Sequence, residues 1–516
     1  MASAPADGVP VSPTAQSARW TLVLAVVLTA VLEVLDSTIV NVALPHMQAA
    51  FGIASDQTTW ILTSYIVSSV VVMPLTGFFS RRFGRRRLIT TAILGFATFS
   101  ALCGMSQSIE MMVTCRIGQG LFGAFLIPLS QSILFDAFPI EKRGQSMALF
   151  GLGVVVAPIL GPTIGAILTE YFSWRAVFYV NLPIAAFALM MISGELTRDE
   201  TKRIEVDWVG LALMVTAVGM LQFVLDQGQT RDWFSDRGIQ VAAILSFASA
   251  VVFLIRGWNF PGNIIDFGLL RDRSFASANI AMIGFGLAMY GAIAMLPLFV
   301  QGLLNYPVLD AGYLFMPRGL AAGFSMVVTG AVLVRRFDQR LLVAIGLTMT
   351  GFGNMMLGWL NLNAGFWDLA WPGVISGLGM GLFFVPMSTL AFQHIDNRKQ
   401  DEASGIYGVM RSLGSSVGIA IVGWQYAQRL QFHWNALAAG ITPFNEAART
   451  YVQQLQLLPG SVQAAEEIAA QVAQQAAMLA FQDAFILSGY AAFLMLPIIL
   501  LIDRPQRGVS PSIPAH

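Results

Sequence analysis

The sequence predicts an all-α polytopic membrane protein, and three observations support this fold class. Of the 516 residues, 56% are hydrophobic and only 11% are charged, whereas a soluble globular domain carries about 25% charged residues. Apolar runs of about 20 residues, the length that crosses the hydrocarbon core as a helix, recur along the whole chain. Segments of the first half also recur in the second half, as in membrane proteins built from two related bundles.

Fourteen apolar runs qualify as candidate spans. In chain order they cover residues 20–44, 59–79, 88–106, 110–134, 146–169, 175–194, 208–226, 239–257, 276–301, 311–334, 341–360, 370–392, 404–427 and 483–502. If the N-terminus is cytoplasmic, most Lys and Arg residues fall in inside loops, including the run RRFGRRR at 81–87. Because basic residues favour cytoplasmic loops, this bias predicts cytoplasmic N- and C-termini and an even number of spans.

The internal repeat sets the organisation of the helices. TGFFSRRF at 76–83 resembles TGAVLVRRF at 329–337, GAFLIPLS at 123–130 resembles GLFFVPMS at 381–388, and GPTIG at 161–165 parallels GSSVG at 414–418. These matches pair span 2 with span 10, span 4 with span 12 and span 5 with span 13. The chain is therefore predicted to hold two six-helix bundles, with spans 7 and 8 inserted between them.

The predicted units follow from this pairing. They are a disordered tail at 1–19, an N-terminal six-helix bundle at 20–194, two inserted helices with a cytoplasmic linker at 195–275, a C-terminal six-helix bundle at 276–502 and a cytoplasmic tail at 503–516. The one long outside loop, 428–482, is rich in Ala and Gln and has helical apolar spacing. We interpret this loop as an extracytoplasmic helical hairpin.

Two acids lie inside the first candidate span. Glu33 and Asp36 are three residues apart and share one helical face. A carboxylate in mid-membrane costs about 2.5–3.5 kcal/mol on insertion scales, so it normally faces a bundle interior or a wet cavity. We predict that Asp36, with Glu33 beside it, carries protons as its surroundings alternate. The alternatives are a structural hydrogen bond for Asp36 and an ion pair within the bundle for Glu33.

A substrate cavity is expected between the bundles near mid-membrane. Large aromatic and Met side chains suit varied amphipathic ligands, and amide side chains supply polar contacts. The candidate lining residues are Asn41, Trp60, Tyr65, Gln119, Phe125, Tyr290, Phe299, Gln301, Met316 and Phe384. For any one apolar residue, packing within a bundle or facing lipid is the competing interpretation. Arg318 and Arg411 are the buried cations of the second bundle, with gating and capping roles both open.

Other function classes find little support in the sequence. No GxxxxGK[ST] motif is present, so a proton gradient rather than ATP is the expected energy source, without a cofactor. The four His residues are scattered and give no metal-ligand spacing. The RRFGRRR run is interpreted as a lipid-facing or gating loop rather than a nucleic-acid patch. We therefore expect neither an enzyme nor a nucleic-acid binder.

Five motifs carry a resemblance to a known family. They are LDSTIVNVALP at 35–45, GFFSRRFGRRR at 77–87, RIGQG at 116–120, APILGPTIG at 157–165 and SWRAVFYVNLPI at 173–184. Together they resemble the motifs of the fourteen-span EmrB/QacA-type drug:proton antiporters of the major facilitator superfamily, in particular the EmrB-type multidrug exporters of Gram-negative bacteria. The resemblance runs nearly end to end.

The resemblance implies a major facilitator fold and proton-driven multidrug efflux across the inner membrane. It also implies that span 4 lies beside span 1, so that Arg116 contacts deprotonated Asp36 directly or through Gln119 or water; the alternative is a fixed structural ion pair. Asn181 is expected to hold the end of span 6. The motif residues with implied gating or packing roles are Gly77, Arg82, Gly84, Arg85, Gly120, Gly153, Pro158, Gly161, Pro162, Gly165 and Arg411.

The resemblance further implies a partner, a periplasmic EmrA-like adaptor that leads to an outer-membrane channel. Loop 428–482 is expected either to dock this adaptor or to close the cavity as a lid. Two positions depart from the wider pattern. Arg81 stands where the superfamily's loop motif usually has an acid, although EmrB-type members also tend to be basic there. Glu33 stands where close relatives often have a neutral polar residue. The rival functions are export of one endogenous metabolite or siderophore and proton-coupled import.

Overall fold

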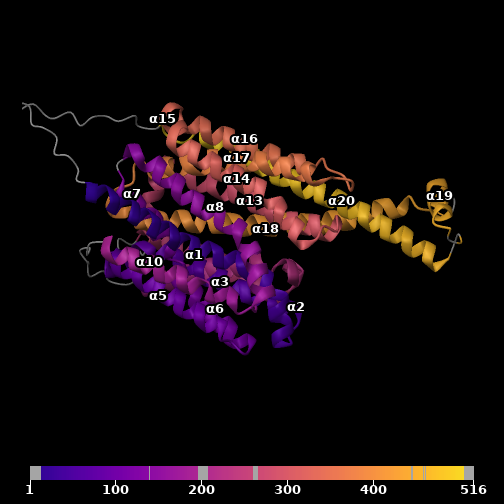
Figure 1. The fold of residues 1–516 in the computed structure, drawn as a ribbon, viewed down its shortest axis with the longest axis horizontal. Coiled ribbons are helices and arrows are strands. Elements are labelled where there is room, and N and C mark those ends of the chain that lie inside the picture. The colour runs from indigo at the N-terminus through magenta and orange to yellow at the C-terminus, as the bar shows by residue number, and fades with distance from the viewer. Residues whose placement is uncertain are drawn as a thin grey trace, which may run out of the picture.

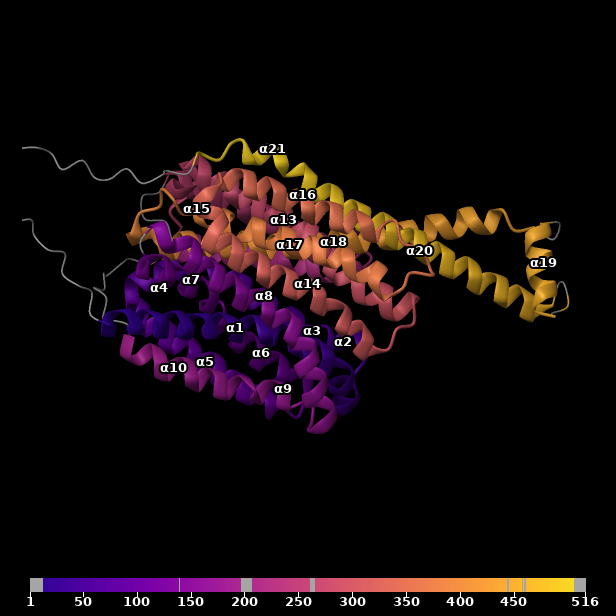
Figure 2. The same ribbon diagram turned by 45° about the horizontal axis from the view of Figure 1, so that its top comes forward.

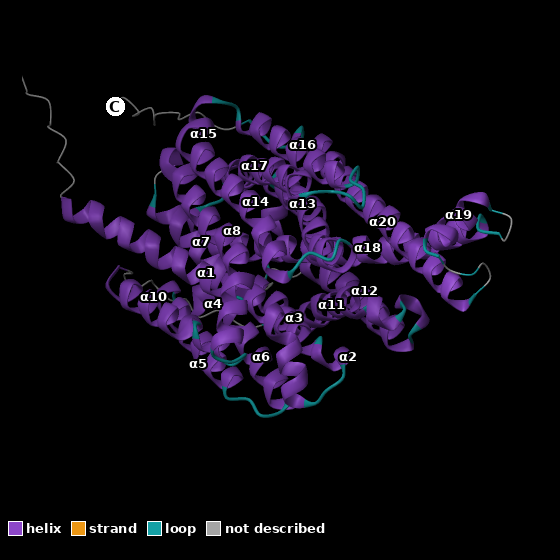
Figure 3. Cartoon of the chain, turned by 45° about the vertical axis from the view of Figure 1, so that its right-hand side comes forward, coloured by secondary structure: helices purple, strands orange, loops and turns teal. Residues whose placement is uncertain are grey.

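The computed structural model describes residues 13–138, 140–195, 207–259, 265–442, 445–456, 458 and 461–504. Within these ranges every regular element is a helix, as predicted. The helices run side by side and form two halves, the N-terminal half in indigo to magenta and the C-terminal half in orange to yellow (Figure 1). Figure 3, coloured by secondary structure, shows the same helical architecture from another side.

The N-terminal bundle is built from six long segments that run along the bundle, and some of them consist of two helices joined by a short turn. They are α1 (Pro13–Phe51); α3 (Trp60–Val72), continued through the turn Met73–Leu75 into α4 (Thr76–Phe83); α5 (Arg85–Gly104); α6 (Ile109–Gly123) with α7 (Leu126–Ala137); α8 (Ile140–Tyr171); and α10 (Asn181–Glu195). The short helices α2 (Ser55–Thr58) and α9 (Ala176–Tyr179) lie in its connections.

The C-terminal bundle has the same number of segments. They are α13 (Arg273–Pro297), α14 (Val308–Val328) with α15 (Val334–Arg336), α16 (Gln339–Leu357), α17 (Phe366–Ala391), α18 (Gln400–Ala439), and α20 (Val462–Leu494) with α21 (Leu496–Ile499). Between the bundles in the chain are α11 (Trp208–Gln227) and α12 (Arg237–Asn259), and α19 (Glu446–Gln454) lies between α18 and α20.

The helices agree with the predicted spans in position but not fully in number. Twelve helices in the described part of the chain are long and apolar enough to cross a membrane. The fifth and sixth predicted spans fall on α8 and on the shorter apolar helix Ala176–Ile192, which are not among the twelve. The predicted tail also needs correction, because α1 begins at Pro13 rather than at Trp20. Residues 1–12 and 505–516 lie outside the described part.

Repeated glycines let equivalent helix pairs approach closely in the two bundles. A Cβ atom at Gly161 of α8 would lie 2.1 Å from Thr38 Oγ1 of α1, and one at Gly165 would lie 2.9 Å from the Ile39 carbonyl oxygen. In the second bundle, Gly414 of α18 stands in the same way against α13. The GPTIG and GSSVG segments therefore make corresponding contacts, since only glycine permits backbones to come so close.

The two inserted helices lie against both bundles. Trp60 of α3 stacks on Phe223 of α11, with ring centres 6.0 Å apart. On the other side, Gln222 Nε2 of α11 donates to Ser416 Oγ of α18 at 2.7 Å. Figure 3 shows α11 and α12 beside α3 and below α18. The insertion is therefore attached to the outer surface of the two-bundle core rather than placed within it.

Segment 428–482, predicted as a helical hairpin, continues two membrane helices outward. It holds the end of α18, all of α19 and the start of α20, so that α18 alone has 40 residues. Figure 2 shows α18, α19 and α20 projecting beyond the bundles. Where the two long helices run together, His433 and Arg429 of α18 both contact Asp483 of α20, at 2.9 and 3.3 Å.

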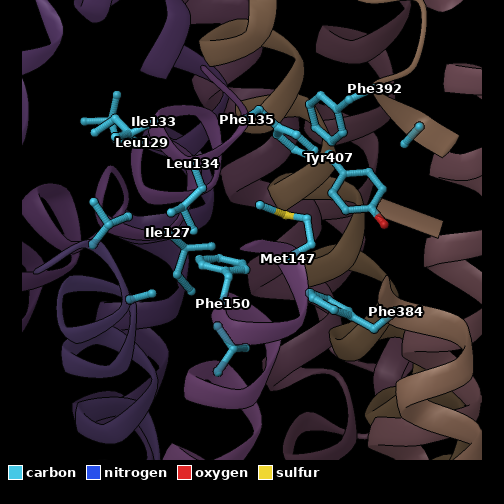
Figure 4. Packing of buried hydrophobic residues seen from close by; sticks show 14 of the residues in the cluster. Ile127, Leu129, Ile133, Leu134, Phe135, Met147, Phe150, Phe384, Phe392 and Tyr407 are labelled. Carbon is cyan, nitrogen blue, oxygen red and sulfur yellow. The ribbon is translucent and has the colours of Figure 1, made fainter. Parts of the chain in front are cut away.

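The bundles meet through an apolar seal at the end of the molecule where α4, α7 and α18 converge. We call this the basic end, since it also holds Arg81–Arg87. The rings of Phe135 and Phe392 are 4.6 Å apart across it. Figure 4 shows the surrounding buried side chains, which include Phe135, Met147 and Phe150 of the first bundle and Phe384, Phe392 and Tyr407 of the second.

Candidate functional site

Asp36 lies at the centre of a buried polar cluster in the N-terminal bundle. Arg116 Nη1 of α6 donates to Asp36 Oδ2 at 2.6 Å, and Gln119 Nε2, one turn later, donates to Oδ1 at 2.9 Å. Asn181 Nδ2 of α10 donates to the same Oδ1 at 2.7 Å. The side chains of Asp36 and Arg116 are fully buried. The predicted pairing of Arg116 with Asp36 is present as a direct contact.

The environment of Arg116 explains how a guanidinium is accommodated there. Its Nε donates to the Ile61 carbonyl at 3.1 Å, and its Nη1 also reaches Gln119 Oε1 at 2.8 Å. The Tyr65 ring lies 4.2 Å from its Cζ, an arrangement that stabilises the cation. Its Nη2 has no hydrogen-bond partner. Removing one member of such a buried ion pair destabilises a protein by about 3–5 kcal/mol, because the other charge is left without a partner.

The geometry limits how Asp36 can take up a proton. Both of its oxygens accept hydrogen bonds from N–H donors. Oδ1 accepts two of these hydrogen bonds and Oδ2 accepts one, so the acceptor position left for a proton is on Oδ2, where the adjacent Arg116 cation opposes protonation and where a bound proton would weaken the three hydrogen bonds. Proton binding at Asp36 is thereby linked to rearrangement of α1, α6 and α10, which carry these groups.

Glu33 differs from Asp36 in its surroundings. Its side chain is almost buried, but Oε2 has no hydrogen-bond partner. The opposite charge that acts on it is Arg411 of α18, across the boundary between the bundles. The Tyr65 hydroxyl, also unpartnered, interacts electrostatically with both acids. Glu33 Oε2 is therefore open to a proton, whereas each oxygen of Asp36 already accepts at least one hydrogen bond.

The antiporter motif of α8 packs directly beside this cluster. Gly161 and Gly165 contact Thr38 and Ile39, the residues that follow Asp36 by two and three positions. Gly153 lies farther along α8, where a Cβ would be 2.5 Å from Val27 Cγ1. Movement of α8 against α1 would therefore displace the turn that holds Asp36. Pro158 is half-buried on α8, and the Pro162 side chain lies outside the described part.

A second charged cluster joins the bundles at the basic end. Arg85 Nε of α5 donates to Asp401 Oδ2 at 2.7 Å, and the same guanidinium pairs with Asp136 of α7. Ser80 and Ser132 also donate to Asp401. Asp401 lies in the first turn of α18, where the positive end of the helix dipole favours an acid. Within the described part of the chain, this cluster holds the ion pairs that cross between bundles.

Arg81, the basic residue that departs from the loop motif, has its partner on a helix of the other bundle. It forms an ion pair with Glu402, which also lies in the first turn of α18. A Cβ at Gly77, one turn before Arg81, would lie 2.5 Å from Glu402 Cβ. Where the loop motif usually has an acid, this chain therefore has an arginine that pairs with an acid on the facing helix. Gly84 has φ of 82° and lets the chain turn from α4 into α5.

The linker before α13 extends the cluster. Lys399 Nζ contacts Asp266 Oδ2 at 2.5 Å, and Asp266 N donates to Glu402 Oε1. Partial burial favours a higher pKa for Asp266, but its hydrogen bonds with Lys399 and with the Gly268 amide outweigh burial and hold the pKa below its usual range. The hydrogen bond to Asp266 in turn raises the pKa of Lys399.

The predicted cavity residues separate into several environments. Gln119 and Tyr65 belong to the Asp36 cluster, and Trp60 contacts the inserted helix α11. Phe125 packs on Phe79 within its own bundle. Phe384 contacts the opposite bundle directly, where it lies beside Gly151 of α8. The structure therefore does not bring the predicted set together as one wall.

Phe299 is a clear correction. Its side chain is fully buried, and its ring packs 5.2 Å from that of Phe481 and 5.7 Å from that of Phe485 in α20. It belongs to the core of the C-terminal bundle and does not line a space between the bundles. Tyr290, Gln301 and Met316 are half-buried, and Asn41 is exposed and donates to the Ser37 carbonyl. A cavity role for these four residues stays a prediction.

Among the motif residues, Gly120 is buried where α6 crosses α3, and a Cβ there would lie 2.5 Å from the Tyr65 carbonyl oxygen. Arg82 is exposed near the Phe83 ring. Sequence reasoning missed Asp136, Asp401 and Glu402, and it gave Asn181 only a structural role. The sequence did contain a signal for Asp401 and Glu402, because these acids directly follow a basic loop and precede a predicted span.

Comparison with known proteins agrees with this architecture. Residues 26–419 match the family model described as Major Facilitator Superfamily. The chain is 31% identical over 495 residues to the multidrug export protein EmrB of Escherichia coli (strain K12), covering 94% of this chain and 96% of that protein. It is 32% identical over 482 residues to the fatty acid resistance protein FarB of Neisseria gonorrhoeae, covering 92% and 94%.

A solved structure also resembles the fold. The crystal structure of the human organic anion transporter MFSD10 superposes with a TM-score of 0.62, covering 93% of this chain and 99% of that one. Sequence identity is 15%, so this likeness concerns the fold alone.

Proposed function

Because the chain belongs to the major facilitator superfamily and resembles EmrB-type exporters along nearly its whole length, we propose that it exports drugs across the bacterial inner membrane in exchange for protons. The observation that carries the proposal is the buried Asp36–Arg116 pair, whose carboxylate has every oxygen engaged. Because these hydrogen bonds favour the ionised carboxylate, proton uptake is easier after the surrounding helices move, and such a dependence is what coupling proton transfer to a conformational change requires.

The proposed cycle uses two conformations. In the conformation described here, the bundles are joined at the basic end by Arg81, Arg85, Asp401 and Glu402. Since basic loops favour the cytoplasm, we take this end as cytoplasmic and the conformation as closed toward the cell interior. Opening this end would break those ion pairs and admit a drug from the inside. Protons that bind Glu33 and Asp36 from the outside would favour release of the drug.

The two acids have different proposed roles. Glu33, with a free oxygen at the boundary between the bundles, would receive the proton first. Asp36, enclosed by Arg116, Gln119 and Asn181, would receive it when α8 shifts along α1. Tyr65 stands close enough to interact with both acids and would help the proton pass between them.

We further propose that the exporter works with a periplasmic EmrA-like adaptor and, through it, an outer-membrane channel. The support is the resemblance to EmrB proteins and the projecting hairpin of α18, α19 and α20 (Figure 2). Its tip carries exposed Leu455, Leu458 and Val462, a surface suited to a protein partner. The projection leads away from the bundles, which favours the docking role over a lid.

The decisive experiment is drug-induced proton release. Purified protein in a weakly buffered detergent solution is mixed with saturating amphipathic drugs, and a pH indicator records the protons released. The native protein is expected to release protons, and Asp36→Asn to release fewer. Asp310→Asn, at an exposed position near the start of α14, is the matched control and should behave as the native protein. Drug binding without proton release would reject coupling.

The second candidate is export of one endogenous compound, and breadth of substrates in cellular efflux assays separates it from multidrug export. The direction of transport is tested in inverted membrane vesicles, where an exporter fills the vesicle and an importer does not.

A further inference from the structure

The charges deep in the membrane helices do not balance. Apart from Arg429 and Asp483, which pair where α18 and α20 run together, five charged side chains in the described part of the chain lie well away from the ends of their helices: Glu33, Asp36, Arg116, Arg318 and Arg411. Three of them are arginines and two are acids. Arg116 pairs with Asp36, and Arg411 acts on Glu33. Arg318 is left without an acid even when both carboxyl groups are ionised.

Arg318 is buried and unpartnered. Its residue is only 8% exposed. Within the described part of the chain it makes no ion pair and no side-chain hydrogen bond, and no acidic group acts on its charge. Its nitrogens are not among the fully enclosed unpartnered atoms, so the guanidinium keeps a small exposed surface. Arginine keeps its charge under all ordinary conditions, and a guanidinium in this position needs a partner.

The surroundings of Arg318 are apolar along the helix axis. Leu314, one turn before it, belongs to a buried cluster with Leu369 of α17. Ala322 and Met326, one and two turns after it, belong to a second cluster that includes Phe384. A single cation thus interrupts an apolar face of α14. An amphipathic acid would match this pattern, with its charged group at the guanidinium and its carbon skeleton along the apolar side chains.

The facing helix α17 offers no acceptor side chain at this level. Gly373 of α17 stands opposite, where an added Cβ would lie 3.4 Å from Arg318 Cβ, and Gly377 packs on the Arg318 backbone. Neither residue offers a side chain that could accept a hydrogen bond from the guanidinium. The acceptor must therefore come from elsewhere, and a planar carboxylate fits the two parallel N–H groups of arginine.

We propose that Arg318 binds the acidic group of the exported compound, so that amphipathic organic anions with a carboxylate are substrates. This inference rests on the proposed export function and specifies its substrate class. It places cargo recognition in the C-terminal bundle and proton exchange in the N-terminal bundle. The two ligands then use separate sites and influence each other through the conformations that they favour.

The test compares one anion with its neutral counterpart. The probe is 11-(dansylamino)undecanoic acid, and the reference is its methyl ester, which has the same apolar body without the charge. Binding to the purified full-length protein in lipid nanodiscs is followed by dansyl fluorescence. The native protein should bind the acid about tenfold or more tightly than the ester, as expected for a charge-assisted hydrogen bond. Equal affinity for acid and ester would overturn the inference without any variant.

Variants test whether Arg318 is responsible for the preference for the acid over the ester. Arg318→Gln should weaken binding of the acid by about tenfold or more and leave the ester unchanged. Arg318→Lys keeps the charge and should retain most of the preference for the acid. Arg449→Gln removes an exposed arginine near the hairpin tip and should have no effect. If Arg318→Gln bound the acid like the native protein, or lost acid and ester equally, Arg318 would not recognise the anion.

Transport assays distinguish a failure of the Arg318 inference from a failure of the proposed export function. In inverted vesicles with an acidic lumen, the native protein should accumulate the dansyl acid, a direction opposite to the passive distribution of a weak acid. Ethidium export that persists in Arg318→Gln, together with loss of dansyl acid export, supports the inference. Selective binding of the acid without proton-driven transport of any probe would refute the export function while leaving the Arg318 site standing.

Discussion

Gly77 of α4 lies against the Cβ atom of Glu402 of α18, so closely that a side chain at position 77 would come within 2.5 Å of it. The contact crosses the boundary between the two bundles at the basic end. It also sits one turn from Arg81, which pairs with the same glutamate. The backbone contact and the ion pair therefore close the same surface.

Gly77→Val should prevent this closure. The added side chain meets backbone atoms of α18, which cannot move aside like the end of a flexible side chain. We expect the basic end to open and efflux to fall by about tenfold or more, since an overpacked contact costs about 1–3 kcal/mol. Spin-label distances between Arg87→Cys and Arg398→Cys, both at exposed positions, report the opening. Gly312→Val, where an added Cβ has open space, is the control; the same distances in Gly77→Val as in the native protein would contradict the prediction.

Asp36→Asn should abolish proton-driven efflux while the protein still reaches the membrane. Asparagine keeps one oxygen to accept from Arg116, so the expected loss of stability is smaller than the about 3–5 kcal/mol of an orphaned buried charge. Drug transport against a gradient and thermal unfolding in detergent measure the two effects. Efflux at the native rate would show that Asp36 does not carry the coupling proton.

Reversing one charge of the Arg81–Glu402 pair should impair transport, and reversing both should partly restore it. Arg81→Glu places two acids together, and Glu402→Arg places two cations together. The double variant restores attraction across the boundary, so a double-mutant cycle should give a favourable coupling energy of about 0.5–3 kcal/mol. The cycle is measured on efflux rates. Strictly additive losses would mean that the pair has no joint role.

Lys399→Gln should change the response of stability to acid. The pKa of Asp266 is lowered by Lys399, so the folded state binds fewer protons here than the unfolded state does between the two pKa values. The contribution of the contact is therefore present above the ordinary Asp pKa of about 3.9 and is lost as the pH falls through the lowered value. The difference in unfolding temperature between native protein and variant should shrink from pH 6 to about pH 3. Lys142→Gln, a lysine that is also exposed, is the control, and a difference independent of pH would exclude this role for Asp266.

The sequence predicted the bundles, the repeat and the Asp36–Arg116 pair because these depend on signals along the chain. Long apolar runs must form helices in a membrane, and a buried acid and arginine must find partners. The hydrogen bond from Asn181 to Asp36 was not predicted, because an amide at the start of a span gives no sign of which residue it contacts. Its contact with Asp36 depends on how α10 packs against α1.

The same limit explains the other errors. Phe299 was placed in a cavity because an aromatic residue in a membrane helix gives the same pattern whether it faces lipid, a core or a cavity. Asp401 and Glu402 were missed because acids in the first turn of a helix are common. Only the approach of α4 and α5 from the other half of the chain makes them partners of Arg81 and Arg85.

Helix α18 is unbroken over 40 residues, a length of about 60 Å. Its first turn forms ion pairs with the opposite bundle, its middle carries Arg411 and its far end forms one arm of the hairpin. Because the helix is long and continuous, a tilt of a few degrees about its first turn moves its far end by several ångströms. A protein bound to the hairpin would therefore be displaced by any such tilt of α18.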